Sequence, residues 1–216
     1  MEVLSYSCQP LDSRMYCLIE NQSAIIIDPC VDEGLKKVLE QKGITKVLVL
    51  LTHEHYDHIS GVNWIRDICL ATHVFCSCGC ARNLRHPEDN LSAFSEVLLM
   101  DKERENNSFN GLNFQPYSCE ADETFEGEYE FIWQGHKIFL KETPGHSKGS
   151  ICILVDEEIL FSGDTLVTGH ETILRLPGGS KKDFAGITLP YLESLDREIM
   201  VYPGHGEPQK LAEFMK

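Results

Sequence analysis

Short apolar runs, separated by turn-forming residues, divide this chain into predicted strands and helices. The run KVLVLL at residues 46–51 is rich in branched side chains and too short for a stable helix, so it predicts a buried strand. Residues 33–42 predict a helix, because apolar residues recur there at helical spacing between a capping Asp32 and Gly43. Before residue 80 the pattern also predicts strands at residues 15–20, 23–29 and 72–77 and a helix at residues 59–69.

The second half of the chain begins with weaker periodicity and then returns to short strands. Residues 80–100 predict helix in pieces, interrupted at Pro87, and the polar, glycine-containing stretch 101–128 predicts a loop or lid. The pattern then predicts strands at residues 130–135, 136–143, 150–156, 158–164 and 199–203 and helices at residues 181–196 and 208–216. This order favours an α/β fold with helices outside a pair of mixed sheets, as one domain over residues 1–216.

The composition is that of a globular protein, with 42% apolar and 25% charged residues. No window approaches the roughly 18 uninterrupted apolar residues of a membrane span. The N-terminal residues lack the basic-then-apolar order of a secretory signal, so we expect a cytoplasmic protein that does not bind a membrane. The formal net charge of −15 argues against nucleic acid as a partner, since nucleic-acid binders carry a basic patch.

Nine cysteines, an odd number, are spread along the chain, and without a signal peptide they are expected to be reduced thiols. Three of them, Cys76, Cys78 and Cys80, form the cluster FCSCGC, which invites a metal-binding interpretation. However, Cys76 and Cys78 alternate as on one face of a strand, and the sequence contains no C-x-x-C pair. We therefore interpret the cluster as apolar filling near a strand end.

The segment LTHEHYDHISG at residues 51–61 concentrates titratable side chains directly after the predicted strand 46–51. His53 and His55 are two residues apart, so a bent loop can direct both imidazoles at one cation, while Asp57 and His58 face a second. Imidazole and carboxylate ligands without thiolate suit Zn²⁺, Fe²⁺ or Mn²⁺. The segment therefore predicts a metal site.

Three distant turns, each at the end of a predicted strand, supply further ligands: His146 in KETPGHSKGS, Asp164 in LFSGDT and His205 in VYPGHGE. Together the ligands fit two divalent metal ions, one held by His53, His55 and His146 and the other by Asp57, His58 and His205, with Asp164 bridging them. Such a pair leaves room for a bridging water, and the cations lower its pKa toward neutrality, which yields a hydroxide nucleophile.

The motifs H-x-H-x-D-H, T-P-G-H-S-x-G-S, F-S-G-D-T-L and Y-P-G-H-G, in this order, resemble the metallo-β-lactamase superfamily in its glyoxalase II-like branch. The resemblance extends from about Ile25 to Glu207. It implies an αββα sandwich of two mixed sheets flanked by helices, with the metal site at one edge between the sheets. It also implies the seven ligands given above, zinc as the expected metal with iron or manganese as alternatives, and a small-molecule substrate. Monomer and homodimer are both left open.

The sequence departs from glyoxalase II in two places that bear on the substrate. The C-terminal helical domain of those enzymes has no counterpart after His205, and HETILRLPGGS keeps LPGGS without the usual arginine and aspartate placement. The resemblance therefore favours hydrolysis of a small thioester or ester other than S-lactoylglutathione. In this interpretation Asp57 and Asp164 are the catalytic carboxylates, and the loops at 83–128 and 168–183 set the specificity.

Two neighbouring branches of the superfamily stay open as alternatives. Persulfide dioxygenases share H-x-H-x-D-H-I-x-G with HEHYDHISG, but they bind a single iron and carry a downstream arginine pattern that is not evident here. Quorum-quenching lactonases are also similar, but they typically carry a tyrosine where this sequence has Val167.

Overall fold

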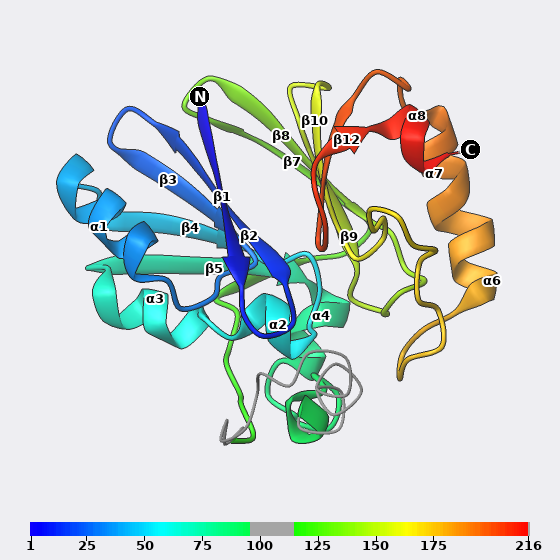
Figure 1. The fold of residues 1–216 in the computed structure, drawn as a ribbon, viewed down its shortest axis with the longest axis horizontal. Helices are drawn as coiled ribbons and strands as arrows, with labels where there is room; N and C mark the ends of the chain where they lie inside the picture. Colours follow the sequence, from blue (N-terminus) through cyan, green and yellow to red (C-terminus); the bar gives the residue numbers. More distant parts are fainter. Residues whose placement is uncertain (96–114, 216) are drawn as a thin grey trace.

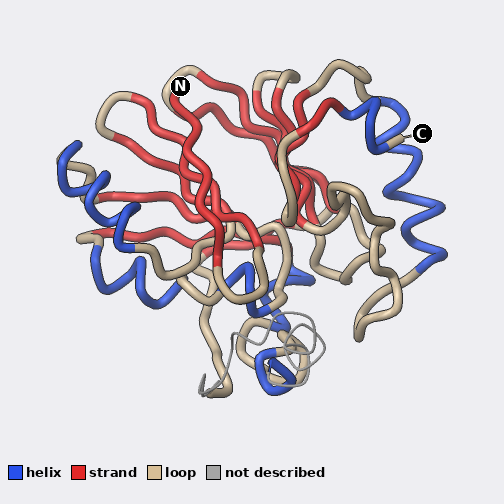
Figure 2. The backbone as a smooth tube through the Cα atoms, in the orientation of Figure 1, coloured by secondary structure: helices blue, strands red, loops and turns tan. Residues whose placement is uncertain are grey.

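Two six-stranded mixed sheets pack face to face, with helices on both outer faces, in a computed structural model that describes residues 1–95 and 115–215 (Figure 1, Figure 2). The predicted sandwich of two sheets between helical layers is confirmed. Among the described residues, no helix is long and apolar enough to cross a membrane.

The first sheet has the strand order β1–β2–β3–β4–β5–β6, antiparallel from β1 to β3 and parallel from β3 to β6. Parallel neighbours need crossover connections, and helices supply them on the outer face of this sheet. The strands are β1 (Glu2–Cys8), β2 (Ser13–Glu20), β3 (Ser23–Ile27), β4 (Lys46–Leu50), β5 (Ala71–Ser77) and β6 (Glu123–Phe125). The helices are α1 (Glu33–Lys42), α2 (Tyr56–Ile59), α3 (Val62–Ile68) and α4 (Cys78–Asn83), with a 3₁₀ turn at Ser92–Phe94.

The second sheet has the order β12–β11–β10–β9–β8–β7, and its strands are antiparallel except for the parallel pair β10 and β11. The strands are β7 (Glu128–Trp133), β8 (His136–Glu142), β9 (Ile151–Val155), β10 (Ile159–Gly163), β11 (Met200–Pro203) and β12 (Gln209–Lys210). The helical segments are α6 (Lys181–Asp183), a wider π-type turn (Phe184–Thr188), α7 (Leu189–Ser194) and α8 (Leu211–Phe214).

Strand β3 illustrates how a continuous apolar run builds a layered protein. Ile25 and Ile27 are buried between the two sheets, whereas Ala24 and Ile26 face the helices of the first sheet. Side chains alternate between the two faces of a strand, so a strand covered on both faces needs apolar residues at every position. A third core lies between the second sheet and its helices.

Several elements differ from the sequence prediction. Strand β1 was not predicted, because its burial is mixed and no apolar run marks it; seven register pairs with β2 hold it in the sheet. Strand β6 lies in a stretch predicted as loop, and β12 occupies residues 209–210, which were predicted to be helical. The parts of the predicted segments 80–100 and 101–128 that fall at residues 96–114 lie outside the described residues.

The cysteines divide into one disulfide and seven free thiols. Cys8 and Cys30 form a disulfide between the end of β1 and the loop after β3, so the prediction of reduced thiols is wrong for this pair. The two residues are 22 positions apart in sequence, and only the tertiary fold brings them together. Cys76 and Cys80 are buried in the apolar core, and no cysteine of the described ranges belongs to a cluster that fits a metal ion.

Burial in the core predicts that two isoleucines in strands contribute differently to the free energy of unfolding. Ile26 is fully buried and Ile132 in β7 is 66% exposed. We expect Ile26→Ala to lower the free energy of unfolding by about 2–5 kcal/mol, because it leaves a cavity. Ile132→Ala should change it by less than about 0.5 kcal/mol. Urea denaturation measures both, and equal losses would contradict the layered core.

Candidate metal centre

The seven predicted ligands meet at one edge of the sandwich, where strands of both sheets end. In the first sheet β3 and β4 are parallel, and in the second β8, β10 and β11 all run in one direction. The amide of Ile151 donates to the carbonyl of Thr52 at 2.8 Å and joins the two sheets at this edge. Turns that are far apart in sequence therefore lie side by side.

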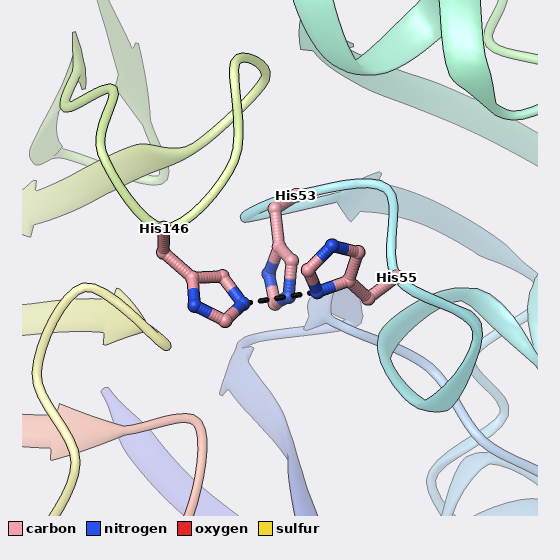
Figure 3. A group of neighbouring side chains, drawn as sticks. All are labelled: His53, His55 and His146. Carbon is pink, nitrogen blue, oxygen red and sulfur yellow. Dashed lines mark hydrogen bonds between the residues drawn. The ribbon is translucent and has the colours of Figure 1, made fainter. Parts of the chain in front are cut away.

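The first group consists of His53, His55 and His146, all buried (Figure 3). Two of the rings come from the loop after β4, and the third comes from the turn after β8. One ring nitrogen of each lies within 4.8 Å of the others, and His55 Nδ1 is 2.9 Å from His146 Nε2. Three converging imidazoles are a typical zinc donor set.

The second group consists of Asp57, His58 and His205. Asp57 Oδ2 lies 3.4 Å from His58 Nε2 and 3.3 Å from His205 Nε2. The side chain of His205 is 24% exposed, so this group is the more open of the two. Its one carboxylate and two imidazoles suit the same range of divalent ions.

Asp164 lies between the two groups and presents one oxygen to each. Its Oδ2 is 3.5 Å from His146 Nε2, while its Oδ1 is 3.3 Å from His58 Nε2 and 3.6 Å from His205 Nε2. This is the arrangement of a bridging carboxylate. The structure thus brings together all seven residues that the sequence predicted as ligands.

Several buried atoms of the cluster fit a bound cation. Within the described part of the chain, His53 Nε2, His55 Nε2, His58 Nε2 and Asp164 Oδ1 are buried and have no hydrogen-bond partner. A buried polar atom without a partner costs free energy, and a cation would supply the missing interaction. The donor set is therefore consistent with a pair of divalent metal ions.

Asp28, at the end of β3, organises the loop that carries four of the seven side chains. Its Oδ1 accepts from the amide of Thr52 at 2.7 Å, and its Oδ2 accepts from Thr52 Oγ1 at 2.5 Å and from His58 Nδ1 at 2.9 Å. Asp28 also lies within reach of His53 and His58 as a further candidate ligand. Because both its oxygens already accept hydrogen bonds, we assign it the role of orienting His58.

Thr52 continues this chain of hydrogen bonds. Its hydroxyl donates to Asp28 and so accepts from His53 Nδ1 at 3.0 Å, which leaves the Nε2 lone pair of His53 free for a metal. Thr143 and Thr165 also lie near cluster residues in sequence, and their hydroxyls lie 3.3 Å from each other. Asp28 was missed, although it follows an apolar run as the recognised ligands do.

The protonation of the two groups differs for physical reasons. Burial lowers the pKa of His53 well below its ordinary value and that of His55 to about 3. Burial also disfavours the charged form of His58, but the carboxylates of Asp57 and Asp164 outweigh it and raise its pKa well above the ordinary value. At His205, too, Asp164 and Asp57 outweigh the effect of burial and raise the pKa. His53 and His55 are therefore held as neutral imidazoles, whereas His58 and His205 keep their protons to higher pH.

This difference in pKa predicts that the second group loses its metal ion first as the pH is lowered. A ligand with a raised pKa keeps its proton to higher pH, so protons compete with the metal at His58 and His205 at a pH where His53 and His55 are still neutral. We expect about two zinc equivalents at about pH 8 and about one at about pH 5.5. Metal analysis after gel filtration at each pH measures this, and simultaneous loss of both ions would contradict it.

Orientation by Asp28 predicts a selective effect on the second group. Asp28→Asn replaces an acceptor of His58 Nδ1 with a group that also donates, and we expect zinc affinity at the second group to fall about 10–100-fold. Asp156→Asn is the matched control, because Asp156 Oδ2 accepts from His136 Nδ1 at 2.6 Å in the turn between β9 and β10. Calorimetric zinc titration compares the two, and equal affinities would contradict the assignment.

A cavity of about 480 Å³ adjoins the cluster and contains His146, Asp164 and His205 in its wall. His170, Glu171 and Ile173 of its wall come from the predicted specificity loop at 168–183. Asp12 and Arg14 of the β1–β2 hairpin also line this cavity, a contribution that the sequence did not predict. Arg14 is fixed there by its amide, which donates to the carbonyl of Gly204 at 2.8 Å, and by an ion pair with Glu207.

A larger cavity of about 630 Å³ lies behind the same loop, but none of the seven cluster residues lines it. The two cavities share Val167, His170 and Glu171 as a common wall. The larger cavity has the greater volume, but His146, Asp164 and His205 line the smaller one. The smaller cavity is therefore the one that opens onto the cluster.

Comparison with known proteins gives the class to which this fold and cluster belong. The family profile described as "Metallo-beta-lactamase superfamily" matches residues 10–205. A "Probable metallo-hydrolase" of Streptococcus pyogenes is 32% identical over 88% of this chain and 78% of its own length. A "Hydroxyacylglutathione hydrolase" of Francisella philomiragia is 26% identical over 94% of this chain and 67% of its own. The crystal structure of BLEG-1 B3 metallo-beta-lactamase superposes with a TM-score of 0.76 and 26% identity, over 99% and 96% of the two chains.

The chain therefore belongs to the metallo-β-lactamase superfamily and has its fold. With the buried clusters of histidine and aspartate, these relatives make it a probable metal-dependent hydrolase.

Proposed function

We propose that this protein is a dinuclear hydrolase, with zinc as its metal, that acts on a small thioester or ester. The observation that carries the proposal is Asp164, whose two oxygens face two separate ligand groups across distances of 3.3–3.6 Å. His58 and His205 lie at one oxygen of this carboxylate and His146 lies at the other, so donors for a second cation are in place beside those for the first.

Two divalent cations in these groups supply an activated water and a Lewis acid that polarises the carbonyl of the substrate. The chain's own residues provide the geometry. Asp57, the carboxylate of the second group, orients the attacking water, and Asp164 holds the two groups at a fixed separation. The low pKa of Asp57, about 2, arises because burial is outweighed by His58 and His205, so its carboxylate stays ionised through the physiological range.

The cavity supports a small substrate. Its volume of about 480 Å³ lies within the range of small-molecule sites, about 300–1,000 Å³. The thioester or ester class is supported by the likeness to a hydroxyacylglutathione hydrolase. The net charge of −15 favours a small molecule over nucleic acid as the partner. A cytoplasmic location is also part of the proposal.

Removal of the bridging carboxylate tests the proposal directly. We expect Asp164→Ala to lower metal content below about two equivalents and to reduce kcat/KM at least about 10³-fold across a panel of thioesters and esters, because both cations lose a ligand. Asp156→Asn, at a turn away from the cluster, should leave both quantities unchanged. A fully active, metal-replete Asp164→Ala protein would overturn the scheme.

The same preparation separates the alternatives. About two zinc ions per chain with thioester or ester turnover supports the proposal. One iron per chain with thiol-dependent oxygen uptake would replace it with a persulfide dioxygenase. Turnover confined to lactones would narrow it to a lactonase.

A further inference from the structure

Glu54 lies between two histidines of the first group, yet it belongs to neither ligand group. It is 1% exposed. Its carboxylate makes two hydrogen bonds of 2.8 Å: Oε1 accepts from Asn83 Nδ2 in α4, and Oε2 accepts from Ser147 Oγ. Burial of a carboxyl group costs free energy unless such bonds hold it, so this side chain has one defined position.

The bond to Ser147 reaches the turn that supplies the third histidine. Ser147 follows His146, and its amide donates to Ser150 Oγ at 3.1 Å within the same turn. The ring of His146 is held separately, because its Nδ1 lies 2.8 Å from the carbonyl of Ile173. Glu54, in the loop of the first sheet, is therefore bonded to the Ser147 side chain of this turn, which belongs to the second sheet.

Gly149 permits the close approach that this connection requires. A Cβ atom at this position would lie 2.5 Å from Glu54 Oε2 and 2.3 Å from the amide nitrogen of Cys80. The turn thus packs directly on Glu54 and α4, and Ser77 Oγ donates to the carbonyl of Gly149 at 2.8 Å. These contacts place the turn against Glu54 with no room for displacement in that direction.

We propose that Glu54 is a positioning residue that couples the loop of His53 and His55 to the turn of His146 and thereby sets the metal affinity of the three-histidine group. The inference rests on the proposed metal-binding function. Groups that hold ligands in place typically contribute about 10–100-fold to metal affinity. The second group has no contact with this carboxylate among the hydrogen bonds of the described residues.

Two variants interrupt the coupling in different ways. Glu54→Met keeps the length of the side chain but accepts no hydrogen bond, and Ser147→Ala removes the hydroxyl at the other end. We measure zinc affinity by calorimetry in the His205→Ala background, which isolates the first group. Each variant should bind zinc about 10–100-fold more weakly, and the loss in the double variant should be smaller than the product of the two single losses, because both changes remove the bond between Glu54 and Ser147.

Three further variants distinguish positioning from a general structural effect. Glu54→Gln should restore most of the affinity, because its amide oxygen accepts from Asn83 and its NH₂ donates to Ser147 Oγ. Asn83→Ala removes the other bond of the carboxylate and should lower affinity less, since α4 supplies no ligand. Ser23→Ala removes the hydrogen bond from Trp133 Nε1 to Ser23 Oγ, away from the cluster, and should leave affinity unchanged.

Failure of the inference is distinguishable from failure of the proposed function. A folded Glu54→Met or Ser147→Ala protein that binds zinc as tightly as its parent would overturn the inference alone. An equal loss at the second group, measured in a His53→Ala background, would also overturn it, because it would indicate general loosening. Failure of the unaltered protein to bind zinc would instead overturn the proposed function.

Discussion

The geometry of the metal centre depends on the buried carboxylate of Asp28. Its two oxygens accept from the amide and hydroxyl of Thr52 and from His58 Nδ1, so one side chain fixes both the start and the end of the ligand loop. Through Thr52 it also determines which nitrogen of His53 carries the proton. The loop after β4 therefore has a defined shape before any cation binds, and the other ligands need only approach it.

Rigid packing of the two sheets brings the other ligands close to this loop. Strands β3 and β9 are apolar on both faces and are held between adjacent cores, so the strand ends have little freedom to shift. Gly204 completes the fit, because a Cβ atom there would lie 2.1 Å from Asp164 Oδ1 and 2.9 Å from His58 Cε1. An apolar sandwich thus holds a charged edge, and the buried atoms without partners at that edge are the ones that cations would satisfy.

Local sequence pattern was sufficient to predict the elements that carry a simple signal in their own residues. The run KVLVLL predicted β4, and Asp32 and Gly43 bounded α1 as the structure has it. The ligand turns were recognisable because each follows an apolar strand with a glycine or proline. Strand β1, the Cys8–Cys30 disulfide and β12 were missed, since each exists through pairing with a partner rather than through its own composition.

The sequence by itself determined the fold class and the seven side chains of the cluster, because strand-end histidines and aspartates in four ordered motifs have few other uses. Only the tertiary structure decided how these side chains are held. The bonds of Asp28 join the end of β3 to the loop after β4 within the first sheet. Those of Arg14 to Glu207 and of Glu54 to Ser147 join the two sheets, across 193 and 93 residues. Such contacts leave no local periodicity in the chain, because the partner that gives each residue its role lies on another strand end.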